Sequence, residues 1–421
     1  MHARTAVISL AILVLGVGLF FAGRASVSNA PNSASNSAES TVVNASFSPL
    51  SVDFTSLTTG WALGTTPCHK DSVCLSLSKT TNAGRSWTVS PLPQSLLHLA
   101  DRKVDGTPSI QNDSLDDNGQ LSMNVRFANA NDGWIYGSLE IPPKVSDEPT
   151  GAFEPILWST HDGGLVWKSQ RQSWIYYEGT VLDLEVTADT VYLMAMNKSF
   201  NVTVESSPVS RDRWRVSDSR GLYTPAGGGF LSGTIVFSGS RGWLAEGNDR
   251  GVSGSAQLSK NGKWVPWTSP CYSVGNSLAV PAAATSNDLF AECHMGGFAS
   301  PLSKAAPRGA TWGSTWLYKS VNAGRTFTAV TELGPQSQYF GPELAVSSSG
   351  TILITKSNPQ NQNLLASFDT GRHWSVVYSG NVIFIHFINS NEGVVLDEPT
   401  HGPNRLIMTF DGGHIWLPIP F

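Results

Sequence analysis

The sequence predicts an all-β chain of repeated four-stranded units, because two short patterns recur along most of its 421 residues. The first is an apolar strand, a turn that ends in Gly-Trp, and a second strand, as around Gly133 and Trp134. The second is a hairpin of the form Ser or Thr, any residue, Asp or Asn, any residue, Gly, two further residues and an aromatic residue. Seven complete or partial copies of this hairpin end at aromatic positions 87, 167, 214, 264, 327, 374 and 416. Repeats of roughly 40–50 residues with four strands each are typical of propeller blades, so we predict a single seven-bladed β-propeller over residues 46–421.

We name the strands of each predicted blade A to D, in chain order. The Gly-Trp pattern supplies strands A and B at residues 52–64, 125–137 and 236–247, with a weaker copy at 385–396. The hairpin pattern joins strands C and D. No long amphipathic helix is expected, and residues 93–101 could form only a short one within a loop.

Five of the seven hairpins carry the complete pattern. Their defining residues are Thr80, Asn82, Gly84, Trp87, Thr160, Asp162, Gly164, Trp167, Ser320, Asn322, Gly324, Phe327, Ser367, Asp369, Gly371, Trp374, Thr409, Asp411, Gly413 and Trp416. The Asp or Asn oxygen can accept backbone N–H bonds inside a tight turn, and Gly supplies a backbone conformation that other residues adopt at a cost. A calcium loop is the alternative, but each hairpin offers one or two oxygen ligands and calcium takes six or more. We therefore predict a structural role for these residues and no metal site.

Two hairpins depart from the pattern. The copy at residues 207–214 lacks both the acidic residue and the glycine, and the copy at 259–264 is two residues short.

The N-terminus is predicted to direct export. Residues 6–22 form an apolar run after His2 and Arg4, and residues 1–26 fit either a cleaved signal peptide or an uncleaved membrane anchor. Residues 27–45 are rich in Ser and Asn and predict a flexible tether. Both alternatives place the propeller in an extracytoplasmic location, secreted or held at the outer face of the membrane.

Composition narrows the classes of partner. Charged residues make up 14% of the chain and the net charge is −5, without a basic run that would neutralise phosphates, so no nucleic-acid partner is expected. Four cysteines fit an oxidising compartment and allow three pairings.

The hairpins resemble Asp-boxes, the bacterial neuraminidase repeats of sialidases, xyloglucanases, sortilin-type receptors and photosystem II assembly-factor-like proteins. The resemblance covers residues 46–421, and it implies a propeller of that superfamily, nearest to non-catalytic secreted members and the assembly-factor-like proteins. It does not carry over sialidase chemistry, because no Arg-Ile-Pro segment occurs and Arg85, Arg325 and Arg372 lie inside the hairpins rather than in a substrate clamp. No catalytic residue and no cofactor are predicted.

Loop lengths predict which face of the propeller carries function. The A–B and C–D turns are short and fall on one face, which we call the turn face. The B–C and D–A connections fall on the opposite face, the loop face, and the long irregular segments expected there are residues 65–73, 90–120, 138–154, 217–231, 247–255, 267–276 and 294–313. Because binding residues concentrate on loops held by a rigid scaffold, we expect the binding site on the loop face. Its candidate residues are Asp101, Arg102, Asp147, Glu148, Tyr177, Glu178, Glu246, Asp249, Arg250, His294 and Trp312.

The cysteines are placed on the same face. Cys68 and Cys74 bracket the first B–C loop, while Cys271 lies in a D–A loop and Cys293 ends a strand B. We therefore favour the pairs Cys68–Cys74 and Cys271–Cys293. Arg126 and His386 lie on predicted inner strands, where alternation leaves open whether each side chain faces the central channel.

The favoured function is an exported, monomeric binding or scaffold protein without enzymatic activity, whose partner is an unknown protein or glycan. Two alternatives remain open. One is a glycoside hydrolase that uses two loop carboxylates, and the other is an assembly factor for a membrane complex, attached through residues 6–22.

Overall fold

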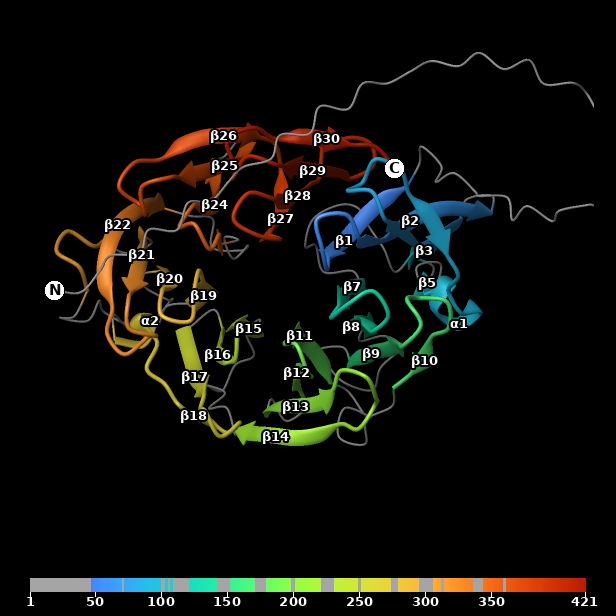
Figure 1. The fold of residues 1–421 in the computed structure, drawn as a ribbon, viewed down its shortest axis with the longest axis horizontal. Coiled ribbons are helices and arrows are strands. Elements are labelled where there is room, and N and C mark those ends of the chain that lie inside the picture. The colour runs from blue at the N-terminus through green and yellow to red at the C-terminus, as the bar shows by residue number, and fades with distance from the viewer. Residues whose placement is uncertain are drawn as a thin grey trace, which may run out of the picture. The chain divides into compact units, whose positions relative to one another are not determined.

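The protein is a seven-bladed β-propeller of four-stranded antiparallel sheets, as predicted (Figure 1). It is known here from a computed structural model. The structure describes residues 47–69, 72–99, 103–104, 107–108, 121–141, 152–170, 179–197, 201–220, 231–248, 251–273, 279–294, 306–311, 314–335, 344–358 and 361–421. Each blade takes its four strands from one continuous stretch of sequence.

The strands of the first four blades are β1 (Ser48–Phe54), β2 (Gly60–His69), β3 (Ser72–Thr80) and β4 (Thr88–Ser90); β7 (Leu121–Phe127), β8 (Gly133–Ile141), β9 (Ala152–Thr160) and β10 (Lys168–Ser169); β11 (Thr180–Val186), β12 (Thr190–Met196), β13 (Val202–Pro208) and β14 (Arg215–Arg220); and β15 (Leu231–Ser238), β16 (Arg241–Asn248), β17 (Gly251–Leu258) and β18 (Trp264–Pro266). Those of the last three are β19 (Ala279–Ala283), β20 (Leu289–His294), β21 (Ser314–Ser320) and β22 (Thr328–Pro335); β23 (Leu344–Val346), β24 (Ile352–Asn358), β25 (Asn361–Ser367) and β26 (Ser375–Ser379); and β27 (Val382–Phe387), β28 (Gly393–Asp397), β29 (Arg405–Thr409) and β30 (Leu417–Ile419). Outside the blades lie α1 (Gln94–Leu97), α2 (Pro270–Ser273) and the small pair β5 (Lys103–Val104) and β6 (Thr107–Pro108).

The ring closes between blades 7 and 1. Successive innermost strands contact one another from β1 to β27, and β1 contacts β28. The Asn404 backbone N–H donates to the Ser48 hydroxyl at 3.0 Å, and the rings of Phe47 and Phe421 lie 4.5 Å apart. Residues 47–421 therefore contain a complete closed propeller with its own core.

Large aromatic side chains fill the spaces between blades. Trp61 is fully buried and stacks on Phe127 of the next blade with ring centroids 3.7 Å apart. A Cβ on Gly60 would lie 2.6 Å from the Phe54 ring, so only glycine lets the strand A ring lie against the backbone there. This close approach is the physical reason for the glycine of the Gly-Trp pattern. A stacked pair such as Trp61 and Phe127 adds about 0.5–1.5 kcal/mol of stability beyond the area it buries.

The five hairpins with the complete pattern each contain the same set of internal hydrogen bonds. In the last copy the Thr409 hydroxyl accepts the Gly413 N–H at 2.9 Å and donates to Asp411, whose Oδ1 also accepts the N–H groups of His414 and Ile415. Gly413 has a φ of 98°, which strains any other residue. Corresponding bonds occur in the hairpins that begin at Thr80, Thr160, Ser320 and Ser367.

The C–D hairpins are also tied to the A–B turns of their own blades. One backbone hydrogen bond, 2.7–3.0 Å long, joins the two turns in blades 1, 2, 3, 5 and 7. The last of these runs from the Gly412 N–H to the Asn391 carbonyl. The turn face is therefore built from short turns that brace one another.

Two of the expected long loops are mostly strand. Within residues 65–73, β2 and β3 remain paired as far as His69 and Ser72. Within residues 247–255, β16 and β17 remain paired as far as Asn248 and Gly251. The small and polar residues in both segments predict loops, but the antiparallel ladder extends through them to a short connection.

Candidate functional site

Most of the loop-face candidates fall outside the described residues. Those outside are Asp101, Arg102, Asp147, Glu148, Tyr177, Glu178, Asp249, Arg250 and Trp312. His294 is the last residue of β20, at the loop-face end of its strand. Glu246 lies on β16 with its side chain 2% exposed and packed against Gly254, so its carboxylate is inside the blade rather than on the surface.

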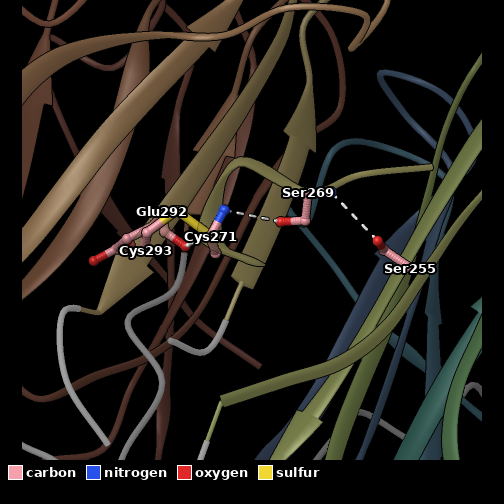
Figure 2. The surroundings of a disulfide bond; sticks show 5 residues. All are labelled: Ser255, Ser269, Cys271, Glu292 and Cys293. Atoms are coloured by element: carbon pink, nitrogen blue, oxygen red, sulfur yellow. Dashed lines mark hydrogen bonds between the residues drawn. A yellow bond between two sulfur atoms is a disulfide. The ribbon is translucent and has the colours of Figure 1, made fainter. Parts of the chain in front are cut away.

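Two disulfides brace the loop-face end of the propeller, and they are the pairs favoured from the sequence. Cys68–Cys74 joins β2 to β3, and Cys271–Cys293 joins α2 to β20. Figure 2 shows how the second one is seated: the Cys271 N–H donates to the Ser269 hydroxyl at 3.3 Å, and the Ser269 N–H donates to the Ser255 hydroxyl of β17 at 3.3 Å. The short helix α2 is thereby held to blade 4 by hydrogen bonds and to blade 5 by a covalent bond. Two such bonds are typical of an oxidising, extracytoplasmic environment.

Removing the two disulfides should lower stability by different amounts. The Cys271–Cys293 bond closes a loop of 22 residues and the Cys68–Cys74 bond a loop of 6. Loop-closure entropy then predicts a loss of roughly 3 kcal/mol for Cys271→Ser with Cys293→Ser, and roughly 2 kcal/mol for Cys68→Ser with Cys74→Ser. Urea unfolding of the two double variants measures both losses, and a larger loss for the shorter loop would contradict the entropic account.

A cluster of charged side chains lies on one side of the propeller axis. Arg126 on β7 donates from Nη1 to Asp53 on β1 at 3.0 Å and from Nη2 to Glu185 on β11 at 2.6 Å. One guanidinium therefore links blades 1, 2 and 3. Arg126 and Glu185 keep 17% and 22% of their side chains exposed, whereas Asp53 keeps 4%. With Asp183 and His386 these residues form what we call the axial cluster.

The carboxylates of the axial cluster also hold the backbone of neighbouring blades. Asp53 Oδ2 accepts the Phe127 N–H at 2.6 Å, and Asp183 Oδ2 accepts the Ile235 N–H at 2.7 Å. The innermost strand of a blade is a sheet edge, whose free N–H groups must find acceptors when they are buried. Asp53 and Asp183 supply those acceptors from the preceding blade.

Burial and mutual charge shift the titration of the cluster. Burial, together with the charge of Asp183, raises the pKa of Glu185 to about 7 although Arg126 opposes the rise. Burial lowers the pKa of His386 to about 3, and the charge of Arg126 adds to the effect. Burial acts to lower the pKa of Arg126, but Glu185 and Asp53 outweigh it and raise the value. At neutral pH, Arg126 is therefore charged and His386 is neutral, while Glu185 is divided between its protonated and its charged form.

The cluster occupies one level and one side of the axis. Register with strand B places seven residues at equivalent positions near the ends of their inner strands. They are Asp53, Arg126, Glu185, Val236, Ala282, Ala345 and His386. Blades 7, 1, 2 and 3 therefore present polar groups, and blades 4, 5 and 6 present small apolar ones. This level lies near the turn face, because each inner strand runs from the loop face into its A–B turn.

The chemistry open to the axial cluster is ion pairing and proton exchange. Within the described ranges, no three His, Cys, Asp or Glu side chains are placed to hold a metal ion. Sequence reasoning named Arg126 and His386 as inner-strand residues but missed Asp53, Asp183 and Glu185. Aligning the ends of the inner strands would have shown a polar residue between two apolar ones at Asp53, Arg126 and His386.

No helix among the described residues is both long enough and apolar enough to cross a membrane.

Comparisons with known proteins extend to the fold alone. No protein-family model matches the chain, and no curated protein matches it. Among solved structures, the BP39L lectin from Burkholderia pseudomallei is 12% identical with a TM-score of 0.50, covering 89% of this chain and 98% of the lectin. YCF48 bound to a D1 peptide is 15% identical with a TM-score of 0.49, covering 88% and 95%. An ulvan lyase of polysaccharide lyase family PL25 is 12% identical with a TM-score of 0.49, covering 86% and 91%. At 12% identity the likeness to the lectin bears on the fold and not on the function.

Proposed function

We propose that this chain is an exported binding or scaffold propeller of the Asp-box superfamily, without enzymatic activity, whose loop face takes a protein or glycan partner. The observation that carries the proposal is the difference between the two faces. The turn face consists of short turns joined by backbone hydrogen bonds. The loop face carries both disulfides and the long connections, such as the segment between β4 and β7.

This difference fits a rigid scaffold that presents variable loops. A disulfide stabilises a loop by limiting the conformations of the unfolded chain, and a loop held in one conformation loses less entropy on binding. The candidate residues retained for this face are those predicted from the sequence, except that the buried Glu246 would reach a ligand only after local opening. The apolar run at residues 6–22 would export the propeller or hold it at the outer face of the membrane.

Site-specific photo-cross-linking tests which face binds. A benzophenone side chain would be placed at Ser95 or Arg308, which are exposed at the loop-face end, or at Thr81 or Thr326, which are exposed on C–D hairpins. We expect a protein or glycan partner from the native cell surface to be captured at Ser95 or Arg308 and not at the other two positions. Capture only at Thr81 or Thr326 would place the partner on the wrong face for this proposal.

A glycan array and a panel of chromogenic glycosides separate binding from catalysis. The lectin among the structural neighbours shares the fold, which makes glycans a sensible first panel. Binding without turnover supports the proposal. Turnover that is lost in a loop-face carboxylate variant such as Glu148→Gln would replace it with the hydrolase alternative.

A further inference from the structure

The C–D hairpins carry a second feature that the loop-face proposal does not use. Each hairpin points the side chains at its tip away from the blade, and these tips are basic or apolar in every blade. The seven C–D turns hold seven Lys or Arg residues and four Asp residues, although the chain as a whole has a net charge of −5.

The basic tips are concentrated in blades 3 and 4, where the hairpin pattern breaks down. Arg211 and Arg213 are exposed in the first hairpin, and Lys260 and Lys263 are exposed in the second. None of the four has an ion-pair partner within the described part of the chain. Blades 3 and 4 are neighbours, since Tyr192 packs edge-on against Trp264 at 5.9 Å. Two adjacent hairpins therefore present four cations without an ion-pair partner among the described residues, against two acids close to them in blade 3, Asp189 and Asp212.

The apolar tips occupy the other five blades. They are Leu165 and Val166 in blade 2, Val321 in blade 5, Phe368 in blade 6, and Phe410 and Ile415 in blade 7, together with Leu57 on the A–B turn of blade 1, all between 40% and 67% exposed. Blades 5, 6, 7, 1 and 2 follow one another around the ring, so these side chains form a continuous arc. We call this the apolar arc, and Arg85, Arg325 and Arg372 are exposed within it.

Tips of neighbouring hairpins contact each other at two of the blade junctions. The Phe368 ring of blade 6 stacks on the His414 ring of blade 7 with centroids 3.8 Å apart and planes 5° apart. His161 of blade 2 places its Nε2 3.4 Å from Asp212 of blade 3. Counted from the Ser or Thr that begins each hairpin, the second residue of one hairpin contacts the sixth residue of the next hairpin in both cases.

The acidic residues of the C–D turns are held by their own surroundings. Asp162, Asp369 and Asp411 each accept two backbone N–H groups of their own hairpin on Oδ1. Asp212 accepts hydrogen bonds from the Ser159 hydroxyl and the Gln170 amide. These hydrogen bonds come from neutral donors and leave the carboxylates charged, and the A–B turns add Asp132, Asp189, Asp288 and Glu392 to the same face. The basic excess of the turn face is therefore confined to blades 3 and 4, where four Lys or Arg residues stand against Asp189 and Asp212.

We propose that the turn face docks on an anionic lipid bilayer, with the basic tips of blades 3 and 4 on the headgroups and the apolar arc in the interfacial layer. A basic sector alone would fit any polyanion. A basic sector that shares one ring of tips with an apolar arc fits a lipid surface, because interfacial binding combines attraction to anionic headgroups with burial of apolar side chains. Docked in this way, the protein presents its loop face away from the bilayer.

Vesicle flotation of residues 46–421 tests this docking, because this part of the chain contains the complete closed ring and omits the apolar N-terminal run; circular dichroism first checks that it is folded. The probes are vesicles of phosphatidylcholine alone and of phosphatidylcholine with 30% phosphatidylglycerol. We expect at least tenfold stronger partitioning onto the anionic vesicles at low salt, and a steep loss as salt is raised, since surface charges are screened. Equal partitioning onto both vesicles would overturn the proposal.

Matched variants separate the two parts of the face. Lys260→Gln with Lys263→Gln should weaken binding about tenfold or more, because each basic residue near an anionic surface contributes about fivefold. Arg308→Gln with Arg405→Gln, the same charge change at exposed positions away from the hairpin tips, should leave it within twofold. Leu165→Ser with Ile415→Ser should weaken binding several-fold, whereas Val216→Ser with Val376→Ser on the exposed outer strands should not.

Two outcomes of these variants would overturn the proposal. One is an equal loss of binding in the control variants. The other is binding that dextran sulfate displaces and that Leu165→Ser with Ile415→Ser leaves unchanged, because the basic sector would then take a soluble polyanion rather than a bilayer. Circular dichroism and the thermal midpoint of each variant confirm that it remains folded.

Discussion

Replacing Arg126 with methionine is expected to lower the free energy of unfolding by about 3 kcal/mol at pH 8. Removal of the guanidinium leaves Asp53, which is 4% exposed, and Glu185, which is 22% exposed, without their shared cation. Breaking a buried ion pair on one side typically costs 3–5 kcal/mol, because a buried charge is left without compensation. The partial exposure of Glu185 places the expected loss at the low end of that range. Urea unfolding of the two proteins at pH 8 measures it.

The same variant should be less damaging at low pH. Burial already raises the pKa of Glu185 to about 7, and loss of Arg126 removes the charge that opposes the rise. Glu185 is then protonated at pH 5 in both proteins, so the penalty for leaving it unpaired disappears there. Arg126→Met combined with Glu185→Gln should recover part of the loss at pH 8. A loss below about 1 kcal/mol would show that the axial cluster does not stabilise the blade junctions, and a loss that does not change between pH 5 and 8 would show that the titration of Glu185 does not contribute to it.

Replacing Glu292 with glutamine is expected to stabilise the protein at pH 8 and to change little at pH 4. Glu292 lies on β20 and is 0% exposed, and neither carboxylate oxygen has a hydrogen-bond partner among the described residues. Burial raises the pKa of Glu292 well above the 4.5 of an unperturbed side chain. The folded state therefore keeps the proton after the unfolded state has released it.

The direction of the pH effect follows from this difference. Between pH 4.5 and the raised pKa, the folded state binds one proton more than the unfolded state, so stability falls as pH rises. The contribution of Glu292 is fully present below pH 4.5 and declines by at most about 1.4 kcal/mol for each pH unit above it. Glu292→Gln cannot titrate and should remove this slope.

Thermal midpoints of both proteins between pH 4 and 9 measure the effect. Glu332→Gln on β22 is the matched control, because Glu332 is exposed in the same blade. We expect the midpoint of Glu292→Gln to exceed that of the unmodified protein increasingly with pH, while Glu332→Gln follows the unmodified protein. Parallel curves for all three proteins would show that Glu292 is paired or hydrated in solution.

Much of the fold could be predicted from local patterns. The Gly-Trp pattern marks a place where an inner-strand ring lies on bare backbone, and the hairpin pattern marks a turn closed by its own side chains. Both are interactions within a few residues or between adjacent strands, so each leaves a signature in most of the blades. Counting them predicts seven blades, and the lengths between them predict the two disulfides at one end.

The axial cluster could be predicted only in part. Arg126 meets Asp53 and Glu185 across three blades, and those partners lie 73 and 59 residues away in the sequence. The sequence places each residue on an inner strand, but the direction of a side chain there depends on how the sheet packs on its neighbours. Likewise, Glu246 is charged within a polar stretch that predicts a loop, yet continued pairing of β16 with β17 buries it.

The sequence by itself determined the number of blades, the hairpins that end each one, and which turns share a face, because these depend on interactions between residues that are close along the chain. The tertiary structure alone decided which charges meet at the axis, that Glu292 is buried without a hydrogen-bond partner among the described residues, and which basic and apolar side chains are exposed together on the turn face. Those features arise where separate blades come together, and burial there depends on surfaces contributed by residues far apart in the sequence.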